Sequence, residues 1–248
     1  MLQACLNGLR GPGDSAAVPM SPESLAESAA RAVAAGAREV RVYPRTPCGA
    51  VSLSPRVLTP VLEAVRAAAG TRTAAANGVA SARVRVATAM AAETDPGRRV
   101  ERIRSWPVLP DLVSVAWHEP DAEEVAAALL QRGVGVEAAL RSGTDGPARF
   151  ARSPLAPRVR RIVAAVPYSP TGTRTGAEAA ARSLLAALVI PPGVPVLLHG
   201  EEGGAWPVLR LARRLGLAAR IGFEDTLLLP DGTPARSNAE LVTAALGS

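Results

Sequence analysis

The sequence predicts a single (β/α)8 barrel that spans residues 1–248 as one domain. Two observations lead to this fold. Short apolar or β-branched runs alternate with amphipathic segments along the whole chain, and eight such runs follow one another. Strict alternation of strand and helix requires a parallel sheet covered by helices. Eight strands fit a closed barrel better than an open doubly wound sheet, because such a barrel takes about 250 residues.

The first half of the chain supplies four strand–helix pairs. The helices are expected to begin at serine or aspartate, in most cases followed by proline, and several to end at glycine. Pro60 lies within the second helical segment and is expected to kink it or delay its start. The expected strands are 2–6, 39–43, 83–88 and 112–117, and the expected helices are 21–35, 54–69, 95–106 and 121–132.

The second half supplies the other four strands. The segment after the fifth strand is rich in glycine and proline, so only a short helix is expected there. The glycine run 8–13 after the first strand is not a dinucleotide-binding motif, because Pro12 interrupts it and no helix starts there. The expected strands are 134–138, 162–166, 194–198 and 220–223, and the expected helices are 148–152, 176–188 and 205–215.

The composition excludes several kinds of chemistry. The chain has no lysine, so its 28 basic residues are all arginine. Schiff-base aldolases, pyridoxal-phosphate enzymes and P-loop phosphate sites each depend on a lysine amine and are therefore excluded. The net charge of +6 does not indicate nucleic-acid binding, because the arginines are spread along the chain and only seven residues are aromatic.

The cysteines and the apolar segments indicate the cellular compartment of the protein. Cys5 and Cys48 are too few for a disulfide framework and have no metal-type spacing, which is typical of a reduced intracellular chain. The first residues lack the charged leader and apolar core of a secretory signal. The most apolar stretch, 184–190, is far shorter than the ~20 residues that span a bilayer. We therefore expect a cytoplasmic protein that binds neither membranes nor nucleic acid.

Reactive side chains of a barrel lie at the carboxyl-terminal ends of its strands. Glu224 and Asp225 directly follow the eighth strand, and adjacent carboxylates repel unless a metal, an arginine or a shared proton offsets them. Either they act as metal ligand and general base, or Asp225 caps the next turn and Glu224 pairs with Arg220. The other polar residues expected near strand ends are Asn7, Arg10, Tyr43, Arg45, Thr88, His118, Glu137, Tyr168, His199 and Glu201.

Alternatives remain open for three of these residues. His118 and His199 are the only histidines. They are either hydrogen-bonding residues of a pocket or, with Glu224, the two-histidine, one-carboxylate set of a catalytic zinc site. Glu137 lies among apolar residues and should point into the barrel, where it needs a cationic partner such as Arg45 or Arg220.

The last strand and the segments around it carry a family resemblance. Arg220-Ile-Gly-Phe-Glu-Asp225 is followed by Leu229-Pro-Asp-Gly-Thr233 and Ser237-Asn-Ala-Glu-Leu-Val242. These blocks resemble the C-terminal signature of the β-keto acid cleavage enzymes, whose best-known member is 3-keto-5-aminohexanoate cleavage enzyme. Segments 18–26, 34–38, 133–137 and 198–201 are similar to the compact bacterial branch of this family, so the resemblance spans nearly the whole chain.

The resemblance implies a zinc-dependent (β/α)8 enzyme, usually a homo-oligomer. Such enzymes transfer an acyl group from a β-keto acid to acetyl-CoA, giving acetoacetate and a new acyl-CoA. The family holds zinc through two histidines of an HxH motif that ends strand two and through the glutamate of the GxED block. Carried over by position, the resemblance implies Glu224 as metal ligand, Asp225, Arg220 and Glu137 as catalytic residues, and Arg45, Thr88, Arg41 and Arg10 as substrate-binding residues.

The strand-two motif departs from the family pattern. Where the family has HxHxR, this chain has Arg41-Val42-Tyr43-Pro44-Arg45, and the family's Ser-Thr pair after strand three is Ala87-Thr88. Arg10 stands where the best-known member has a substrate-contacting acid. An arginine cannot ligate a metal, so two of the three zinc ligands are replaced. Two hypotheses follow: an enzyme acting on a small β-keto acid or acyl-CoA, or a metal-free relative that binds an anionic metabolite or pairs with an active paralogue.

Overall fold

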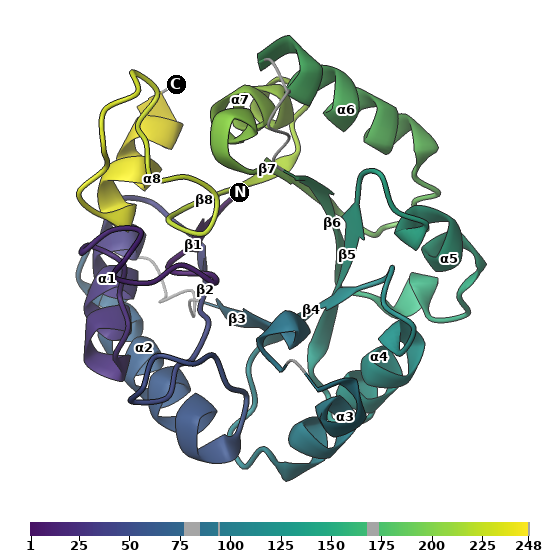
Figure 1. Ribbon diagram of the computed structural model, residues 1–248, viewed down its shortest axis with the longest axis horizontal. Helices are drawn as coiled ribbons and strands as arrows, with labels where there is room; N and C mark the ends of the chain where they lie inside the picture. Colours follow the sequence, from purple (N-terminus) through teal and green to yellow (C-terminus); the bar gives the residue numbers. More distant parts are fainter. Residues whose placement is uncertain (77–84, 94, 168–173, 248) are drawn as a thin grey trace.

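The computed structural model is a closed barrel of eight parallel strands, in which each strand pairs with the next and the last pairs with the first (Figure 1). This confirms the predicted fold class. The structure describes residues 1–76, 85–93, 95–167 and 174–247. The strands are β1 (Leu2–Cys5), β2 (Glu39–Arg41), β3 (Arg85–Ala89), β4 (Leu112–Ala116), β5 (Gly135–Arg141), β6 (Arg161–Val166), β7 (Val196–Gly200) and β8 (Ala218–Ile221).

Helices form a ring outside the strands (Figure 1). No helix in the described ranges combines the length and the apolar character that crossing a membrane requires. The α-helices are α1 (Pro22–Ala34), α2 (Pro55–Ala76), α3 (Pro96–Ser105), α4 (Ala122–Gln131), α5 (Gly146–Arg152), α6 (Arg174–Ala187), α7 (Ala205–Arg214) and α8 (Asn238–Gly247), and the short 3-10 helices are η1 (Met90–Ala92), η2 (Ala156–Arg158) and η3 (Glu202–Gly204).

Several helix ends follow the sequence signals, but the Asp121 side chain at the start of α4 makes no capping hydrogen bond, and the end of α2 differs from the expected one. Ser21 caps α1 by accepting a hydrogen bond from the backbone amide of Ser24. Helix α2, however, continues through Gly70 to Ala76 instead of ending at residue 69. A glycine ends a helix when it adopts the left-handed conformation, as Gly36 does with a φ of 115°. Gly70 keeps a negative φ, so the expected end of this helix was wrong.

Some strand boundaries also differ from those expected. Strand β5 extends to Arg141, three residues beyond the predicted end at 138, because its alternating pattern continues to pair with β6. The predicted start of the third strand at residue 83 lies outside the described residues. Pro60 lies inside α2, but the helix still begins at Pro55, so its start is not delayed.

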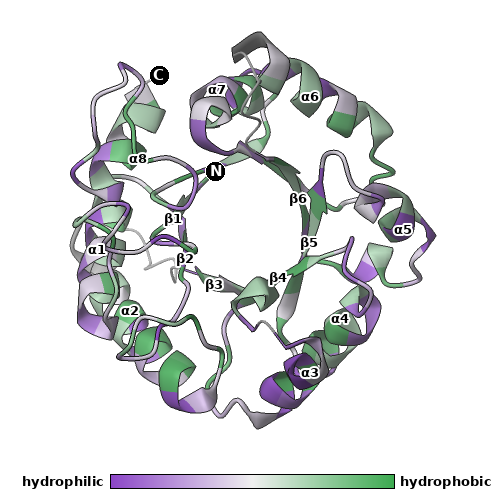
Figure 2. Cartoon of the chain, viewed as in Figure 1, coloured by the Kyte–Doolittle hydropathy of each residue, from purple (hydrophilic) through white to green (hydrophobic). Residues whose placement is uncertain are grey.

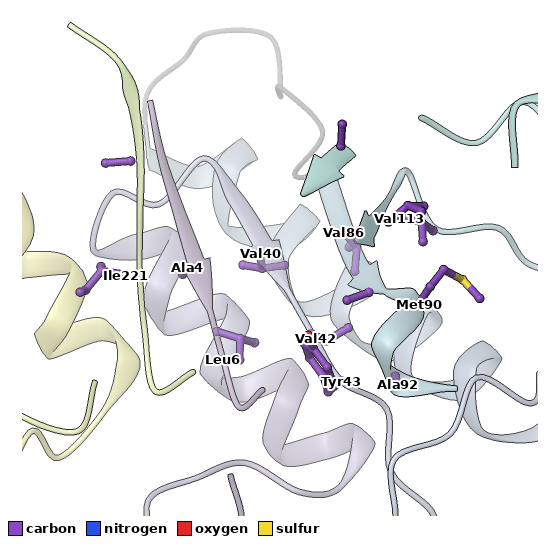
Figure 3. Packing of buried hydrophobic residues seen from close by; sticks show 14 of the residues in the cluster. Ala4, Leu6, Val40, Val42, Tyr43, Val86, Met90, Ala92, Val113 and Ile221 are labelled. Atoms are coloured by element: carbon purple, nitrogen blue, oxygen red, sulfur yellow. The ribbon is translucent and has the colours of Figure 1, made fainter. Parts of the chain in front are cut away.

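Strand alternation separates an apolar outer layer from a polar interior. Val40, Val42 and Val86 point outward and belong to the apolar cluster between the sheet and the helices (Figure 3). Figure 2 shows that β5 and β6 are mostly hydrophobic, whereas α3 at the periphery is mostly hydrophilic. The inward-facing residues include a set of polar side chains less than 5% exposed: Gln3, Glu39, Arg41, Glu137, Arg161 and Arg220.

Ion pairs connect the interior residues of neighbouring and opposite strands. Glu137 on β5 accepts hydrogen bonds from Arg41 on β2, at 2.6 Å, and from Arg161 on β6. Arg161 also lies 2.6 Å from Glu39, and Glu39 accepts a 2.6 Å hydrogen bond from Arg85. Burial would raise the pKa of Glu137, but Arg41 and Arg161 lower it below its usual value. This chain of alternating charges therefore satisfies groups that would be costly to bury alone.

The sequence analysis correctly expected Glu137 to have a buried cationic partner, but the partners differ from those named. They are Arg41 and Arg161, not Arg45 or Arg220. Arg161 was overlooked because it opens β6, whereas the predicted strand began one residue later. Its side chain points inward because it is paired in register with Glu137, which also points inward.

A glycine is required where β8 meets β1. A Cβ atom placed on Gly222 would lie 2.1 Å from the backbone oxygen of Cys5, far inside any real contact. The backbone amide of Glu224 donates a hydrogen bond to the same oxygen, at 3.3 Å. Gly222 therefore lets the loop after β8 pass close to β1, which brings the following carboxylates over the barrel.

We predict that Gly222→Ala destabilises the protein by about 3 kcal/mol, because the backbone atoms that the new methyl group meets cannot move without disturbing the sheet. Gly70→Ala is the matched control, since a Cβ there meets nothing within 4 Å. It should be neutral or stabilise by about 0.5–1 kcal/mol, as expected inside a helix. Urea unfolding measures both variants, and equal stabilities would contradict the assigned role of Gly222.

Candidate active site

The loop after β8 is held in place by Asn238, the first residue of α8. The Asn238 side chain accepts a 2.8 Å hydrogen bond from the backbone amide of Phe223, and donates to the backbone oxygen of Leu6 at 2.8 Å and to the hydroxyl of Ser28 at 3.0 Å. Phe223 is fully buried. This explains why the segment beginning at Ser237 accompanies the strand-eight block: its asparagine fixes the backbone from which Glu224 projects.

Asp225 lies at the centre of a buried hydrogen-bonded group. Arg220 donates to its Oδ1 atom from Nε at 3.0 Å and from Nη2 at 2.6 Å, and His199 Nδ1 lies 3.2 Å from the same oxygen. Burial would raise the pKa of Asp225, but Arg220 and His199 lower it to about 2. Burial and Arg220 lower the pKa of His199, which favours the neutral imidazole. Asp225 is therefore an ionised, tightly held carboxylate.

Glu224 is the carboxylate that faces the mouth of the barrel. Its Oε1 atom lies 3.3 Å from Arg220 Nη2 and 4.0 Å from Arg41 Nη1, and accepts a 3.4 Å hydrogen bond from the Tyr43 hydroxyl. Its Oε2 atom has no hydrogen-bond partner among the described residues. The side chain is 17% exposed, whereas Asp225 is completely buried. Glu224 thus has one oxygen held by cations and one free to accept a proton.

Arg220 contacts both carboxylates of the acidic pair. Glu224 lies beside Arg220, as expected if the pair has a structural role. The carboxylate of Asp225, however, also bonds to Arg220 instead of capping the next turn. The guanidinium groups of Arg220 and Arg41 therefore offset the repulsion between the adjacent carboxylates. This arrangement does not require a metal ion.

Strand two places its side chains as the two-residue repeat predicts. Arg41 and Tyr43 both face inward, Arg41 reaching Glu137 and Tyr43 reaching Glu224. Asn7 fixes the Tyr43 backbone by two hydrogen bonds of 2.9 Å, one to its oxygen and one from its amide. Burial and the nearby Glu224 raise the pKa of Tyr43 well above its usual value, so its hydroxyl stays protonated and remains a donor.

These residues do not fit the zinc that the family resemblance implies. Within the described ranges, no group of three histidine, cysteine, aspartate or glutamate side chains gathers closely enough to hold a metal ion. The guanidinium of Arg41 occupies the space next to Glu224, and an arginine repels a cation. His199 contacts Asp225, whereas burial and the charge of Arg141 lower the pKa of His118. The two histidines and Glu224 therefore do not form the alternative zinc set.

The structure does not bring the remaining expected substrate-binding residues into this group. Arg45 connects the loops after β1 and β2 by donating hydrogen bonds to the backbone oxygens of Gly8, Arg10 and Gly49. Arg10 pairs with Glu202 at the rim. Thr88 lies on the same face of β3 as Val86, which points away from the barrel interior. Tyr168 lies outside the described residues.

One functional candidate was missed by sequence reasoning. Arg141 ends β5, on the same inner face as Glu137, and its two terminal nitrogens each lie 3.4 Å from a carboxylate oxygen of Glu201. Its side chain is 42% exposed at the mouth. The alternation of Glu137, Ala139 and Arg141 was the signal that could have found it, but the predicted strand stopped at residue 138.

We predict that Asp225→Asn lowers the free energy of unfolding by about 3 kcal/mol at pH 7, because Arg220 loses its closest anionic partner in a buried site. The pKa of Asp225 falls from 3.8 unfolded to about 2 folded, so its ionised form stabilises the protein above about pH 4 and less as the pH falls towards 2. The stability difference between wild type and D225N should therefore be constant from pH 7 to about pH 5 and shrink clearly by pH 3.

Urea unfolding at each pH, followed by circular dichroism, measures this difference. Glu178→Gln, which removes the partner of the half-exposed Arg214 at the surface, is the control and should change stability by less than about 1 kcal/mol. A D225N difference of the same size at pH 3 and pH 7 would show that Asp225 is not ionised against Arg220.

The fold is shared with solved structures of low sequence identity. ObcA, in a ternary complex with a C4-CoA adduct and oxalate, matches with a TM-score of 0.67 and 14% identity over 94% of this chain and 64% of that chain. This chain therefore spans less than two thirds of the ObcA chain. Homocysteine methyltransferase MmuM from Escherichia coli matches with a TM-score of 0.61 and 13% identity, over 100% of this chain and 95% of that chain. At these identities the likeness shows the fold alone.

Sequence comparison gives a more specific result. No curated protein matches this chain. A family model described as beta-keto acid cleavage enzyme matches residues 1–247, which is nearly the whole length. This agrees with the resemblance carried by the strand-eight block and with the barrel that presents it. The chain belongs to the beta-keto acid cleavage enzyme family.

Proposed function

We propose that this protein cleaves a small β-keto acid by acyl transfer with acetyl-CoA, giving acetoacetate and a new acyl-CoA, at a site that uses arginine where relatives use a metal. The observation that carries the proposal is the position of Glu224, between Arg220 and Arg41 at the barrel mouth, with one carboxylate oxygen unpartnered. Family membership supports the reaction class. ObcA, a structural neighbour, has been solved with oxaloacetate, itself a β-keto acid.

Glu224 is the general base in this proposal. The reaction requires removal of a proton from the carbon between the keto and carboxylate groups, and Oε2 of Glu224 is free to receive it. Asp225 is a weaker choice because its pKa of about 2 makes it a poor proton acceptor, and both its burial and its contacts hold it in place. We therefore assign Asp225 the role of orienting Arg220.

The guanidinium groups of Arg41 and Arg220, beside Glu224, are suited to stabilise the negative charge that develops on oxygen in the next steps. The carbanion attacks the acetyl thioester and releases the CoA thiolate, which then attacks the original keto carbon. The carbon–carbon bond breaks, and acetoacetate leaves after its carbon recovers the proton from Glu224. Each attack forms an oxyanion, which Arg41 and Arg220 stabilise by their charge and the protonated Tyr43 hydroxyl by a hydrogen bond.

A second function remains a candidate: binding of an anionic metabolite without catalysis. The observation in its favour is that Arg41 and Arg220 are already paired with carboxylates, which weakens them as electrophiles. A guanidinium is also a weaker electrophile than a zinc ion, which polarises a carbonyl by several kcal/mol. The two functions differ in product formation, not in ligand binding.

We predict that wild-type protein forms acetoacetate and an acyl-CoA from a β-keto acid and acetyl-CoA, and that Glu224→Gln lowers kcat by about 100-fold or more, since general-base catalysis contributes about that much. Mass spectrometry of both products measures the rate. Glu178→Gln, far from the site, is the control and should leave kcat unchanged. Binding of β-keto acids by calorimetry without any product, in wild type, would favour the non-catalytic function.

We also predict that Arg41→His combined with Tyr43→His creates a zinc site together with Glu224, because residues 41 and 43 share the inner face of β2 and Tyr43 already reaches Glu224. About one zinc ion per chain should be retained after dialysis and measured by mass spectrometry. Arg41→Gln with Tyr43→Phe removes the same groups without adding ligands and should retain none. A folded His variant without zinc would contradict the assigned geometry.

A further inference from the structure

Arg141 is the least compensated arginine that faces the inside of the barrel in the described part of the chain. Arg41, Arg161 and Arg220 each have a carboxylate oxygen within about 2.6 Å and are at most 4% exposed. Arg141 instead lies 3.4 Å from both oxygens of Glu201, and 42% of its side chain is exposed. It is therefore a cation that can exchange its partner for a ligand.

The surroundings of Arg141 contain charges of both signs. Burial and Arg141 lower the pKa of His118, Asp145 raises it and Arg149 lowers it. Beside and below Arg141, the inner faces of β4 to β6 carry Ala116, Ala139, Val163 and Ala165, none of which has a long side chain. Ala116 and Ala139 are partly exposed although they lie on inner faces. A ligand can therefore approach Arg141 from the centre of the mouth.

Arg141 stands on the wall of the mouth away from the proposed base. It pairs in register with Ala165 on β6, which pairs with His199 on β7. Two strand spacings, about 10 Å, therefore separate the backbone of Arg141 from that of His199. His199 contacts Asp225, the neighbour of Glu224 in the chain. A group bound by Arg141 is thus several bonds away from a carbon that Glu224 deprotonates.

We propose that Arg141 binds a second carboxylate of the substrate, so that the protein prefers β-keto dicarboxylic acids to β-keto monocarboxylic acids. This inference rests on the proposed function for the reacting end of the substrate. Arg141 supplies the fork of donors that matches a carboxylate. Glu201 holds that fork in the free protein and competes with the substrate for it.

The test compares 3-oxoadipate with 3-oxohexanoate, two β-keto acids of equal chain length that differ in the second carboxylate. Wild type should have at least a tenfold higher kcat/KM for 3-oxoadipate. Arg141→Gln should remove this preference by raising KM for 3-oxoadipate at least tenfold, with little change for 3-oxohexanoate. Arg141→Lys should restore part of it, and Glu201→Gln should lower KM for 3-oxoadipate. Arg214→Gln, which breaks a surface pair, should change neither substrate.

Calorimetry with the unreactive acids adipate and hexanoate separates this inference from the proposed reaction. Adipate binding that is tighter than hexanoate binding and is lost in Arg141→Gln supports the role of Arg141 even if no acid is cleaved, in which case the proposed function alone fails. Equal kcat/KM values for the two keto acids in wild type, or an unchanged preference in a folded Arg141→Gln variant, would overturn the inference. Thermal unfolding of each variant confirms that it is folded.

Discussion

Glu137 lies between two guanidinium groups deep in the barrel, and much of the interior depends on this contact. Because Arg41 and Arg161 both bond to it, the charges of β2, β5 and β6 offset one another without solvent. Removing Glu137 would take from both guanidinium groups the carboxylate they share, in a site that water does not reach. Breaking a buried pair in this way typically costs about 3–5 kcal/mol. The network therefore constrains substitution at each of these positions.

The same network explains why the strand-two positions of this barrel do not fit a metal ion. A metal site needs neutral or anionic ligands, whereas this chain places Arg41 beside Glu224 and supplies Glu137 as its counterion. The positive charge at the centre of the mouth is thereby kept, but it is carried by a side chain. Such a charge is fixed in direction and already partly neutralised, so it suits anion binding and oxyanion stabilisation more than strong polarisation of a carbonyl group.

The mouth of the barrel is asymmetric. The ionisable groups around Glu224 come from β2, β7 and the loop after β8, where Glu224 and Asp225 lie close to Arg220. The opposite wall, from β4 to β6, presents Ala116, Ala139, Val163 and Ala165 and carries Arg141 at the end of β5. A molecule bound here would contact the ionisable groups on one side. On the other side it would contact small apolar side chains and the guanidinium of Arg141. Chemistry and selectivity would then reside on different strands, so that one can change without the other.

The sequence determined the barrel, most helix starts and the adjacency of Glu224 and Asp225, because these follow from local alternation, capping residues and chain neighbours. It also determined that residues 41 and 43 share one face, since a strand repeats every two residues. The replacement of the two strand-two histidines followed from the family resemblance, because the family motif could be compared with residues 41–45 position by position. Each of these depends on residues close together in the chain.

Tertiary structure decided which charges meet. Arg161 as the partner of Glu137, Asn238 as the anchor of the loop after β8 and Glu201 as the contact of Arg141 all come from segments far apart in the chain. The sequence offers 28 arginines and no rule for choosing among them. The choice depends on strand register and on the tilt of a closed barrel, which bring distant residues to one level and are fixed only when the eight strands close together.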